Sequence, residues 1–238
     1  MHFQHSKQIW RDFPELVPGV LLVEGITADA STAAAVAELS AVAASRLATT
    51  SEGEFPEVQA WRRAFSRMGL KPTQYRSASE SLLRRYRKQG SLPQVHPLVD
   101  LCNAASLAFA IPVAAFDVAR ITGHLEVRHA TGNESYLTFA GDVEHPDAGE
   151  VIFADGAELA HARRWTNRQS GASAVRATTT NVLIVTEALH DTAPHDIRAL
   201  QATLATAIDA AWSLTPASTV LSQSVPGFTF TPVPPSSS

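Results

Sequence analysis

The chain has 238 residues, of which 45% are hydrophobic and only 18% are charged. This composition suits a folded protein of one large or two small domains and excludes general disorder. A single cysteine, Cys102, excludes a disulfide framework and any Cys-x-x-Cys metal or redox motif. The polar first residues and the lack of a long apolar run lead us to expect a soluble cytoplasmic protein with no membrane span.

The formal net charge of -4 argues mildly against a nucleic-acid partner, but the basic residues are unevenly distributed. Nearly half of them fall between residues 62 and 88, where Glu80 is the only acidic residue. Such a cluster can form a positive face that attracts phosphates, although two solvated helix faces would give the same pattern. The cluster consists of Arg62, Arg63, Arg67, Lys71, Arg76, Arg84, Arg85, Arg87 and Lys88.

The first part of the chain alternates between strand and helix signals. Residues 17–24 are typical of a short strand, and residues 30–48 and 60–68 are typical of helices. Ser77 and Glu80 form an S-x-x-E capping box, in which each side chain satisfies a backbone N–H of the first turn. We therefore expect a further helix to begin there.

The helix expected over residues 97–110 is apolar on nearly every side, which predicts burial. Asp100, Asn103 and Ser106 nevertheless form a polar row along it, three residues apart. A buried polar group without a partner costs roughly 1–3 kcal/mol. The row is therefore expected to face a cavity, a hydrogen-bonded network or the backbone ends of another element.

The middle of the chain is rich in β signals. Hairpins are expected over residues 124–139 and 150–165, and residues 180–186 are typical of a central strand. A last helix is expected over residues 195–212. The pattern predicts an α/β (α+β) fold with a mixed β-sheet core flanked by helices.

We expect one domain over residues 1–215. Its parts are an N-terminal α/β portion at about 17–90, a core motif region at about 91–190, and the C-terminal helix. Residues 216–238 are rich in Ser and Pro and are expected to form a flexible tail.

Five short segments follow one another in a distinctive order. They are Leu98-Val99-Asp100-Leu101-Cys102-Asn103, Pro112-Val113-Ala114-Ala115-Phe116-Asp117, Val127-Arg128-His129-Ala130, Val151-Ile152-Phe153-Ala154-Asp155 and Thr179-Thr180-Asn181-Val182-Leu183. In this order and spacing they resemble the B3/B4 domain of the bacterial phenylalanyl-tRNA synthetase β subunit. Residues 61–85 and 165–170 are similar to freestanding members of the same family.

The resemblance implies a B3/B4-like fold and an aminoacyl-tRNA deacylase that edits in trans, with tRNA and an aminoacyl-tRNA synthetase as candidate partners. A binding pocket distinguishes one methylene by only about 1–3 kcal/mol, so translation needs a second site that destroys wrong products. Ester hydrolysis needs a positioned water, donors for the oxyanion and a side-chain pocket, but no nucleophile triad. No metal or organic cofactor is implied, because His and Asp do not cluster at ligand spacings and no glycine-rich phosphate loop is present.

The resemblance also suggests two catalytic residues. Asn103 matches the pocket Asn of the family and is expected to orient the aminoacyl group or water. Glu187 lies two residues beyond the family's strand-end Glu, whose place is taken by Val185, and residues two apart share a strand face. Glu187 is expected to bind the substrate amino group or to hold water as a base, with a solvent-exposed strand end as the alternative.

Ala114 stands where the family has a histidine that helps to bind the aminoacyl moiety, which puts tyrosine specificity in doubt. His96 and His129 are candidates to replace it, but each is more often explained as a surface or satisfied strand histidine. Cys102 is expected either to line the pocket or to be a small buried hydrophobic residue. A catalytic thiolate there is disfavoured, because an apolar helix raises the pKa of a thiol. The residues expected to line the pocket are Cys102, Ala114, Asn181 and Asp100.

Arg164 and Arg168 flank Trp165 and form a second basic patch, expected to hold the acceptor end of tRNA. Exposed edge charges are the plain alternative. Two other functions remain open: a tRNA- or synthetase-binding module that has lost hydrolysis, and a small-molecule hydrolase unrelated to tRNA.

Overall fold

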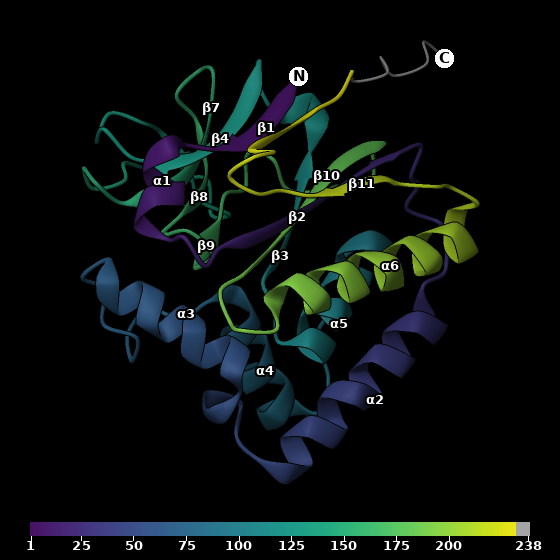
Figure 1. Cartoon of the computed structure of the whole chain (residues 1–238). Coiled ribbons are helices and arrows are strands. Elements are labelled where there is room, and N and C mark those ends of the chain that lie inside the picture. Colours follow the sequence, from purple (N-terminus) through teal and green to yellow (C-terminus); the bar gives the residue numbers. More distant parts are fainter. Residues whose placement is uncertain (232–238) are drawn as a thin grey trace.

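Residues 1–231 are described by a computed structural model, in which two large β-sheets and six α-helices form the protein (Figure 1). The larger sheet has the strand order β12-β1-β4-β7-β8-β9, and only β1 and β4 run parallel in it. Its strands are β1 (His2–His5), β4 (His124–His129), β7 (Val151–Asp155), β8 (Ala160–Arg163), β9 (Arg168–Gln169) and β12 (Gly227–Thr229).

The smaller sheet has the order β11-β2-β10-β3 and is antiparallel throughout. A separate two-stranded ribbon joins β5 and β6. The strands of the smaller sheet are β2 (Val17–Glu24), β3 (Val113–Asp117), β10 (Asn181–Ala188) and β11 (Ala217–Val220), and those of the ribbon are β5 (Tyr136–Leu137) and β6 (Val143–Glu144).

The smaller sheet is buried on both faces and separates two apolar cores. Leu183 and Val185 of β10 face the core shared with the larger sheet, whereas Val182 and Ile184 face the core formed with the helices. Successive side chains of a strand point to opposite faces, so a continuous apolar run supplies both cores at once.

The helices cover the smaller sheet in two layers. Helices α5 and α6 lie directly against it, and α2 and α4 pack on α5 (Figure 1). Two short 3-10 helices, η1 (Glu52–Glu54) and η2 (Val118–Arg120), complete the chain. The α-helices are α1 (Lys7–Asp12), α2 (Ala33–Thr49), α3 (Pro56–Arg67), α4 (Ala78–Gln89), α5 (Pro97–Phe109) and α6 (Ala193–Trp212).

Most of the predicted elements are present with small shifts at their ends. Half of the capping box is confirmed, because the Ser77 hydroxyl accepts the Glu80 N–H at 3.3 Å and α4 begins at Ala78. The Glu80 carboxylate does not complete the box but pairs with Arg62 and Arg76. The helix expected from residue 60 begins earlier, at Pro56, whose missing N–H is tolerated in a first turn. The predicted α/β (α+β) class, with a mixed sheet flanked by helices, is confirmed.

The hairpin expected over residues 124–139 is wrong, because β4 pairs with β7 and β5 pairs with β6. The carboxylate of Glu134 explains the difference. It accepts the N–H groups of Thr131 and Gly132 and a hydrogen bond from Arg128, which holds the chain in a closed loop after β4. The hairpin expected over residues 150–165 is confirmed by the antiparallel pairing of β7 with β8.

The flexible tail expected from residue 216 needs correction, because β11 and β12 lie within it. Each strand pairs with the edge of a sheet, β11 with β2 and β12 with β1. Leu221 and Phe230 are buried in the core between the sheets. Edge pairing and two apolar anchors therefore order a segment whose Ser and Pro content predicted a tail. Residues 232–238, the rest of that segment, lie outside the described residues.

Among the helices of residues 1–231, none combines the length and the apolar character that a membrane crossing requires.

We predict that Phe230→Ala lowers the free energy of unfolding by about 3 kcal/mol, because it empties a buried site in the core. Phe139→Ala is the matched control, since Phe139 is 73% exposed and Phe230 only 7%; its effect should stay within about 0.5 kcal/mol. Urea denaturation followed by fluorescence gives both values. Equal effects would show that the C-terminal segment does not dock in solution.

Candidate functional site

A small cavity of about 60 Å³ lies between the two sheets, next to the end of β10. We call it the Glu187 cavity, after the one carboxylate among its lining residues. Its walls come from β3, β7, β8, β9 and β10, from the segment that links β8 to β9, and from the start of α4. The lining residues are Ala78, Pro112, Val113, Ala114, Phe153, Ala162, Trp165, Thr166, Asn167, Arg168, Gln169, Val185 and Glu187.

Glu187 is held inside the protein by two hydrogen bonds. Its Oε1 lies 2.7 Å from Nε2 of His5 and 2.8 Å from Nε1 of Trp165. The indole can only donate, so this oxygen accepts its hydrogen, and an ionised Glu187 then requires a proton on Nε2 of His5 for the second bond. Glu187 is 2% exposed, so the alternative of a solvent-exposed strand end is wrong.

The segment that carries Trp165 has an unusual backbone. Arg164 and Trp165 are consecutive non-glycine residues with positive φ angles, 46° and 57°. Such angles are uncommon for side chains of this size and are maintained only where the surroundings fix them. Here the Arg164 N–H donates to Glu150 and the Trp165 N–H donates to Val151 O at 2.7 Å. These bonds turn the indole inward, where it reaches Glu187.

Thr166 also lies in the wall of the Glu187 cavity, and its hydroxyl group has no hydrogen-bond partner within residues 1–231. The hydroxyl oxygen is buried. A buried hydroxyl without a partner is costly unless water or a ligand completes it. Thr166 and Glu187 both contribute to the wall of this hollow, so an acidic and a hydroxyl side chain lie around the same space.

Ala114 lies on β3 opposite Val185 of β10, and both residues line the Glu187 cavity. The two positions expected from the resemblance to match the family's His and Glu are therefore apolar neighbours here. The candidate replacements lie elsewhere: His96 caps α5 by accepting the Leu98 N–H at 3.2 Å, and His129 contacts Gly149 O and Asp12. Burial lowers the pKa of His96.

The histidine that does reach Glu187 is His5, which sequence reasoning missed. It belongs to β1, 182 positions away from Glu187. No local motif marks it. The only signal in the sequence is the alternation of residues 2–5, in which Phe3 and His5 share the buried face of a strand.

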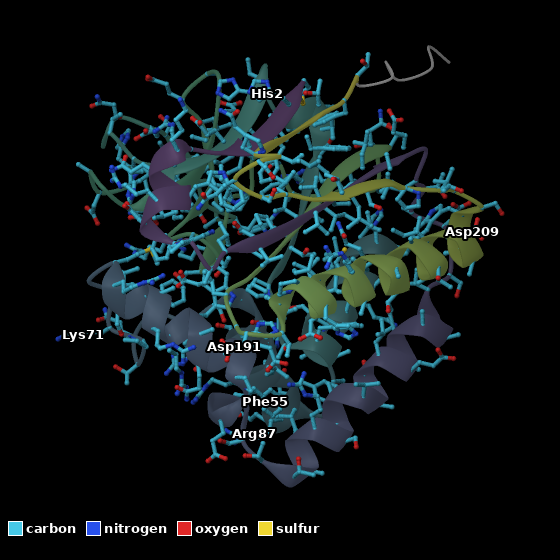
Figure 2. The ribbon with its side chains drawn as sticks, viewed as in Figure 1. His2, Phe55, Lys71, Arg87, Asp191 and Asp209 are labelled. Atoms are coloured by element: carbon cyan, nitrogen blue, oxygen red, sulfur yellow. The ribbon has the colours of Figure 1, made fainter. Side chains whose placement is uncertain are left out.

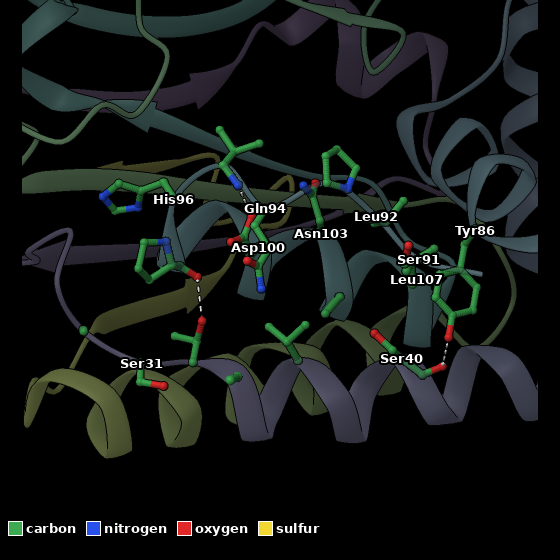
Figure 3. Close-up of a pocket in the computed structure, with 18 of the residues that line it drawn as sticks. Ser31, Ser40, Tyr86, Ser91, Leu92, Gln94, His96, Asp100, Asn103 and Leu107 are labelled. Atoms are coloured by element: carbon green, nitrogen blue, oxygen red, sulfur yellow. Dashed lines mark hydrogen bonds between the residues drawn. The ribbon is translucent and has the colours of Figure 1, made fainter. Parts of the chain in front are cut away.

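Asp100 and Asn103 line a different and larger cavity of about 580 Å³, which we call the α5 cavity (Figure 3). It lies between α5, α2 and the loop of residues 90–96 that precedes α5. The Asp100 carboxylate accepts the Val95 N–H at 2.9 Å and fixes this loop. Ser106, the third member of the polar row, is buried instead and donates to Ile111 O at 2.7 Å.

Cys102 and Asn181 line neither cavity. Cys102 is buried in the core of the helices, and burial raises its pKa to about 12, so it stays a thiol. Asn181 accepts the Gly25 N–H at the opposite end of β10 from Glu187, roughly 20 Å away along the strand. The six expected site residues therefore do not share one hollow: two lie at each cavity and two stand apart.

Buried carboxylates hold several arginines of the basic cluster. Glu80, 1% exposed, bonds Arg62 at 2.7 Å and contacts Arg76, and Glu52, 2% exposed, lies between Arg84 and Arg87. Each carboxylate is shared by two guanidinium groups, so each group of three keeps a net positive charge. Arg67 is paired with Glu15 at the surface.

The C-terminal half of α4 carries the densest positive charge. Arg84, Arg85, Arg87 and Lys88 line a shallow open depression together with Gln89. Arg85 and Lys88 are exposed and make no ion pair within residues 1–231. Arg63 and Lys71 are exposed as well, and Lys71 projects from the protein beside α3 (Figure 2). We call the residues from Arg84 to Lys88 the α4 basic surface.

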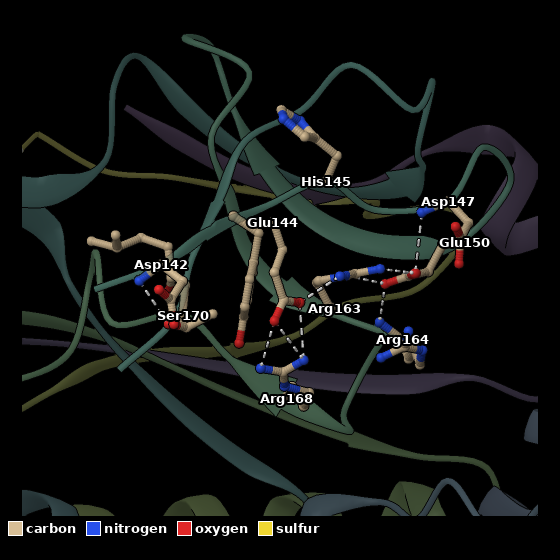
Figure 4. Close-up of polar contacts among 12 residues, drawn as sticks. Asp142, Glu144, His145, Asp147, Glu150, Arg163, Arg164, Arg168 and Ser170 are labelled. Atoms are coloured by element: carbon tan, nitrogen blue, oxygen red, sulfur yellow. Dashed lines mark hydrogen bonds and ion pairs between the residues drawn. The ribbon is translucent and has the colours of Figure 1, made fainter. Parts of the chain in front are cut away.

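Arg164, directly after β8, and Arg168, the first residue of β9, lie next to the Glu187 cavity. The Arg164 guanidinium lies 4.8 Å from the ring centre of Tyr75, and Arg168 is paired with Glu144 at 3.0 Å (Figure 4). The hydrogen bond with Arg168 is the main reason why the pKa of Glu144 is lowered. Glu144 also bonds Arg163, which is buried and bound to Glu150, so Arg163 is structural.

Comparison with known proteins gives one family and several relatives. The family model described as "B3/4 domain" matches residues 60–210. The phenylalanine–tRNA ligase β subunit of Shewanella oneidensis is 29% identical over 105 residues, 44% of this chain and 13% of that protein. The β subunit of Cereibacter sphaeroides is 34% identical over 77 residues, 32% of this chain and 9% of that protein. The chain thus matches only a small part of the length of either relative.

Among solved structures, an N-terminal fragment of the phenylalanyl-tRNA synthetase β subunit from Pyrococcus horikoshii aligns with a TM-score of 0.49 and 10% identity. The alignment covers 90% of this chain and 49% of the fragment. In residues 1–231, no three His, Cys, Asp or Glu side chains are grouped so that they could hold a metal ion.

We predict that the thiol of Cys102 does not react with a disulfide reagent such as DTNB in the folded protein at pH 8. The raised pKa keeps the sulfur in the unreactive thiol form, and burial keeps the reagent from reaching it. The same protein in urea is the control and should release one equivalent of thionitrobenzoate. Rapid reaction without urea would place Cys102 at an accessible surface.

Proposed function

This chain belongs to the B3/4 domain family, and from that premise we propose that it hydrolyses the ester bond of mischarged aminoacyl-tRNA, acting in trans. The observation that carries the proposal is one hollow whose wall holds a buried carboxylate, Glu187, and the hydroxyl of Thr166, which has no hydrogen-bond partner within residues 1–231. Both residues lie within the family match. The names of the relatives, phenylalanine–tRNA ligase β subunits, supply the tRNA in the proposal.

In the proposed reaction Glu187 is the base that activates water. A volume of about 60 Å³ is room for at least one water, since a water needs roughly 10–15 Å³. Glu187 takes a proton from the water as the water oxygen bonds to the ester carbonyl carbon. The bond to the tRNA 3′ oxygen then breaks, and the proton passes to that oxygen. The products are the free amino acid and the uncharged tRNA.

Thr166 has the complementary role in this proposal. Negative charge develops on the carbonyl oxygen during the attack, and the Thr166 hydroxyl, once turned toward the cavity, donates a hydrogen bond that stabilises this charge. Asn103 and Asp100 lie at the α5 cavity, on the opposite face of the smaller sheet, so we assign them no part in this step.

The tRNA would approach over the basic residues. Arg168 lines the Glu187 cavity, and Arg164 stacks on Tyr75 beside it, which offers a guanidinium plane and a ring to single-stranded bases. The α4 basic surface adds exposed cations for phosphates. A synthetase that delivers the tRNA is a further candidate partner, and a tRNA substrate places the reaction in the cytoplasm, where translation occurs.

A non-catalytic binding module is the second candidate function. It is favoured by one observation, the methyl group of Ala114 where the family's histidine would face the cavity. Such a module would keep the basic surfaces and bind tRNA without turnover.

We predict that the protein hydrolyses mischarged tRNAs with small amino acids, such as alanine and serine, faster than those with tyrosine. A hydrophobic cavity of about 150 Å³ is known to hold benzene, and the volume here is well below that. A deacylation screen over a panel of mischarged tRNAs measures the preference. If tRNA binds but no ester is hydrolysed above the background rate, the binding module is correct.

Glu187→Gln should lower kcat for the best substrate of that screen about 100-fold or more, because the amide cannot accept the proton. Glu38→Gln is the control, since Glu38 is exposed on α2. Thermal unfolding of both variants shows whether the fold is kept. An unchanged kcat in folded Glu187→Gln would remove Glu187 from the reaction.

Charge reversal at Arg85 and Lys88 together should weaken tRNA binding and reduce its dependence on salt, because each phosphate contact adds to that dependence. These two residues are chosen because reversing Arg84 or Arg87 would leave the buried Glu52 beside a like charge. Arg198→Glu on α6 is the control, since Arg198 is exposed and, within residues 1–231, its side chain bonds to Pro194 O alone. Unchanged affinity in the double variant would contradict a role of this surface and favour a hydrolase unrelated to tRNA.

A further inference from the structure

We infer that His5 is a positioning residue that fixes the Glu187 carboxylate for the proposed hydrolysis. The inference rests on the proposed function and adds to it a histidine that supports the catalytic carboxylate. That histidine comes from β1, which lies outside the residues 60–210 matched by the family. The N-terminal strand is therefore part of the site rather than an appendage to it.

The bonds to Glu187 define which oxygen can act. Nε2 of His5 and Nε1 of Trp165 both bond to Oε1, at 2.7 and 2.8 Å. Two donors in different directions fix one oxygen and thereby the plane of the carboxylate. The other oxygen, Oε2, is then the one that can accept the proton of a water in the Glu187 cavity. With Trp165 alone, the carboxylate could rotate about a single bond.

Burial makes the second donor necessary. The side chain of His5 is 0% exposed and that of Glu187 is 3% exposed. A carboxylate removed from water needs hydrogen bonds in place of those it loses, and an unpaired one is strongly destabilising. His5 supplies such a bond from the side of β1. Ala114, at the position of the family's histidine, offers only a methyl group.

The backbone around His5 holds the imidazole in place. His5 is the last residue of β1 and aligns with Val127 of β4, and the next residue, Ser6, donates its N–H to Val127 O at 2.9 Å. The Ser6 hydroxyl then caps α1 through the Ile9 N–H. A side chain between a paired strand and a capped helix has little freedom, which is what the support of a catalytic group requires.

The packing of the ring distinguishes this site from ordinary core structure. Phe3 and Trp10 contact the imidazole, with ring centres 5.3 and 5.4 Å away. Its Nδ1 is buried and makes no hydrogen bond within residues 1–231. A position that served packing alone would gain by an apolar side chain, because this nitrogen is buried at a cost. The bond to Glu187 is what the imidazole provides in return.

The test compares His5→Leu, which keeps the size and removes the donor, with His5→Gln, which keeps an N–H that can reach Oε1. We expect His5→Leu to lower kcat on the best aminoacyl-tRNA about 100-fold with KM unchanged. His5→Gln should recover most of the loss. His2→Leu, on the same strand, is the control and should leave kcat unchanged. A change in stability alone would not produce this split between kcat and KM or the rescue by Gln.

The NMR resonance of the Trp165 indole N–H, assigned by its loss in Trp165→Phe, gives a readout that needs no activity. It should move in His5→Leu and stay close to the wild-type position in His5→Gln. If His5→Leu does not fold, His5→Asn replaces it, because its amide is too short to reach Glu187.

The outcomes separate the inference from the proposed function. An active wild-type protein with an unchanged kcat in His5→Leu overturns the inference and leaves the function intact. A wild-type protein that hydrolyses no ester overturns the proposed function. The indole resonance alone then decides whether His5 positions the Glu187 carboxylate. A resonance that moves in His5→Leu supports the role of His5, and one that stays in place overturns it.

Discussion

Buried carboxylates, each satisfied by hydrogen-bond donors of the protein, are the constraint on which this structure depends. A carboxylate out of water is stable only where hydrogen bonds and positive charge replace its hydration. Glu187 ties β1 to β10 and to Trp165, Glu80 ties α3 to α4, and Glu150 ties β7 to β8. Each bond joins two elements at a defined pair of atoms, which apolar packing does not do.

Glu134 shows how strongly such a site favours the ionised form. Burial by itself would raise the pKa of this carboxyl. The hydrogen bonds from the Thr131 N–H and from Arg128 outweigh that effect and hold the pKa at about 2. A carboxyl group whose pKa is lowered by folding stabilises the folded state at pH values above its unfolded pKa. That stability is lost as the pH falls towards 2. The loop after β4 thus keeps this anchor well below neutral pH.

The same constraint changes how the arginine cluster is understood. Several of its members serve buried carboxylates, and the exposed cations Arg85 and Lys88 remain for a partner. Charge counted along the chain therefore overstates the surface available to phosphates. The proposed function depends on the exposed remainder of α4 and on Arg164 and Arg168 near the Glu187 cavity, which is why its test uses residues that hold no carboxylate.

The sequence by itself determined the fold class, most helices and central strands, and the family. Periodicity, capping residues and the order of short motifs are local properties, and local hydrogen bonds and apolar faces obey them. Tertiary structure alone decided which residues meet. Asn103 and Glu187 lie on opposite faces of one sheet, β11 and β12 are ordered by sheet edges, and His5 reaches Glu187 across 182 positions. Contacts of this kind arise from strand pairing between remote segments, and no spacing along the chain records them.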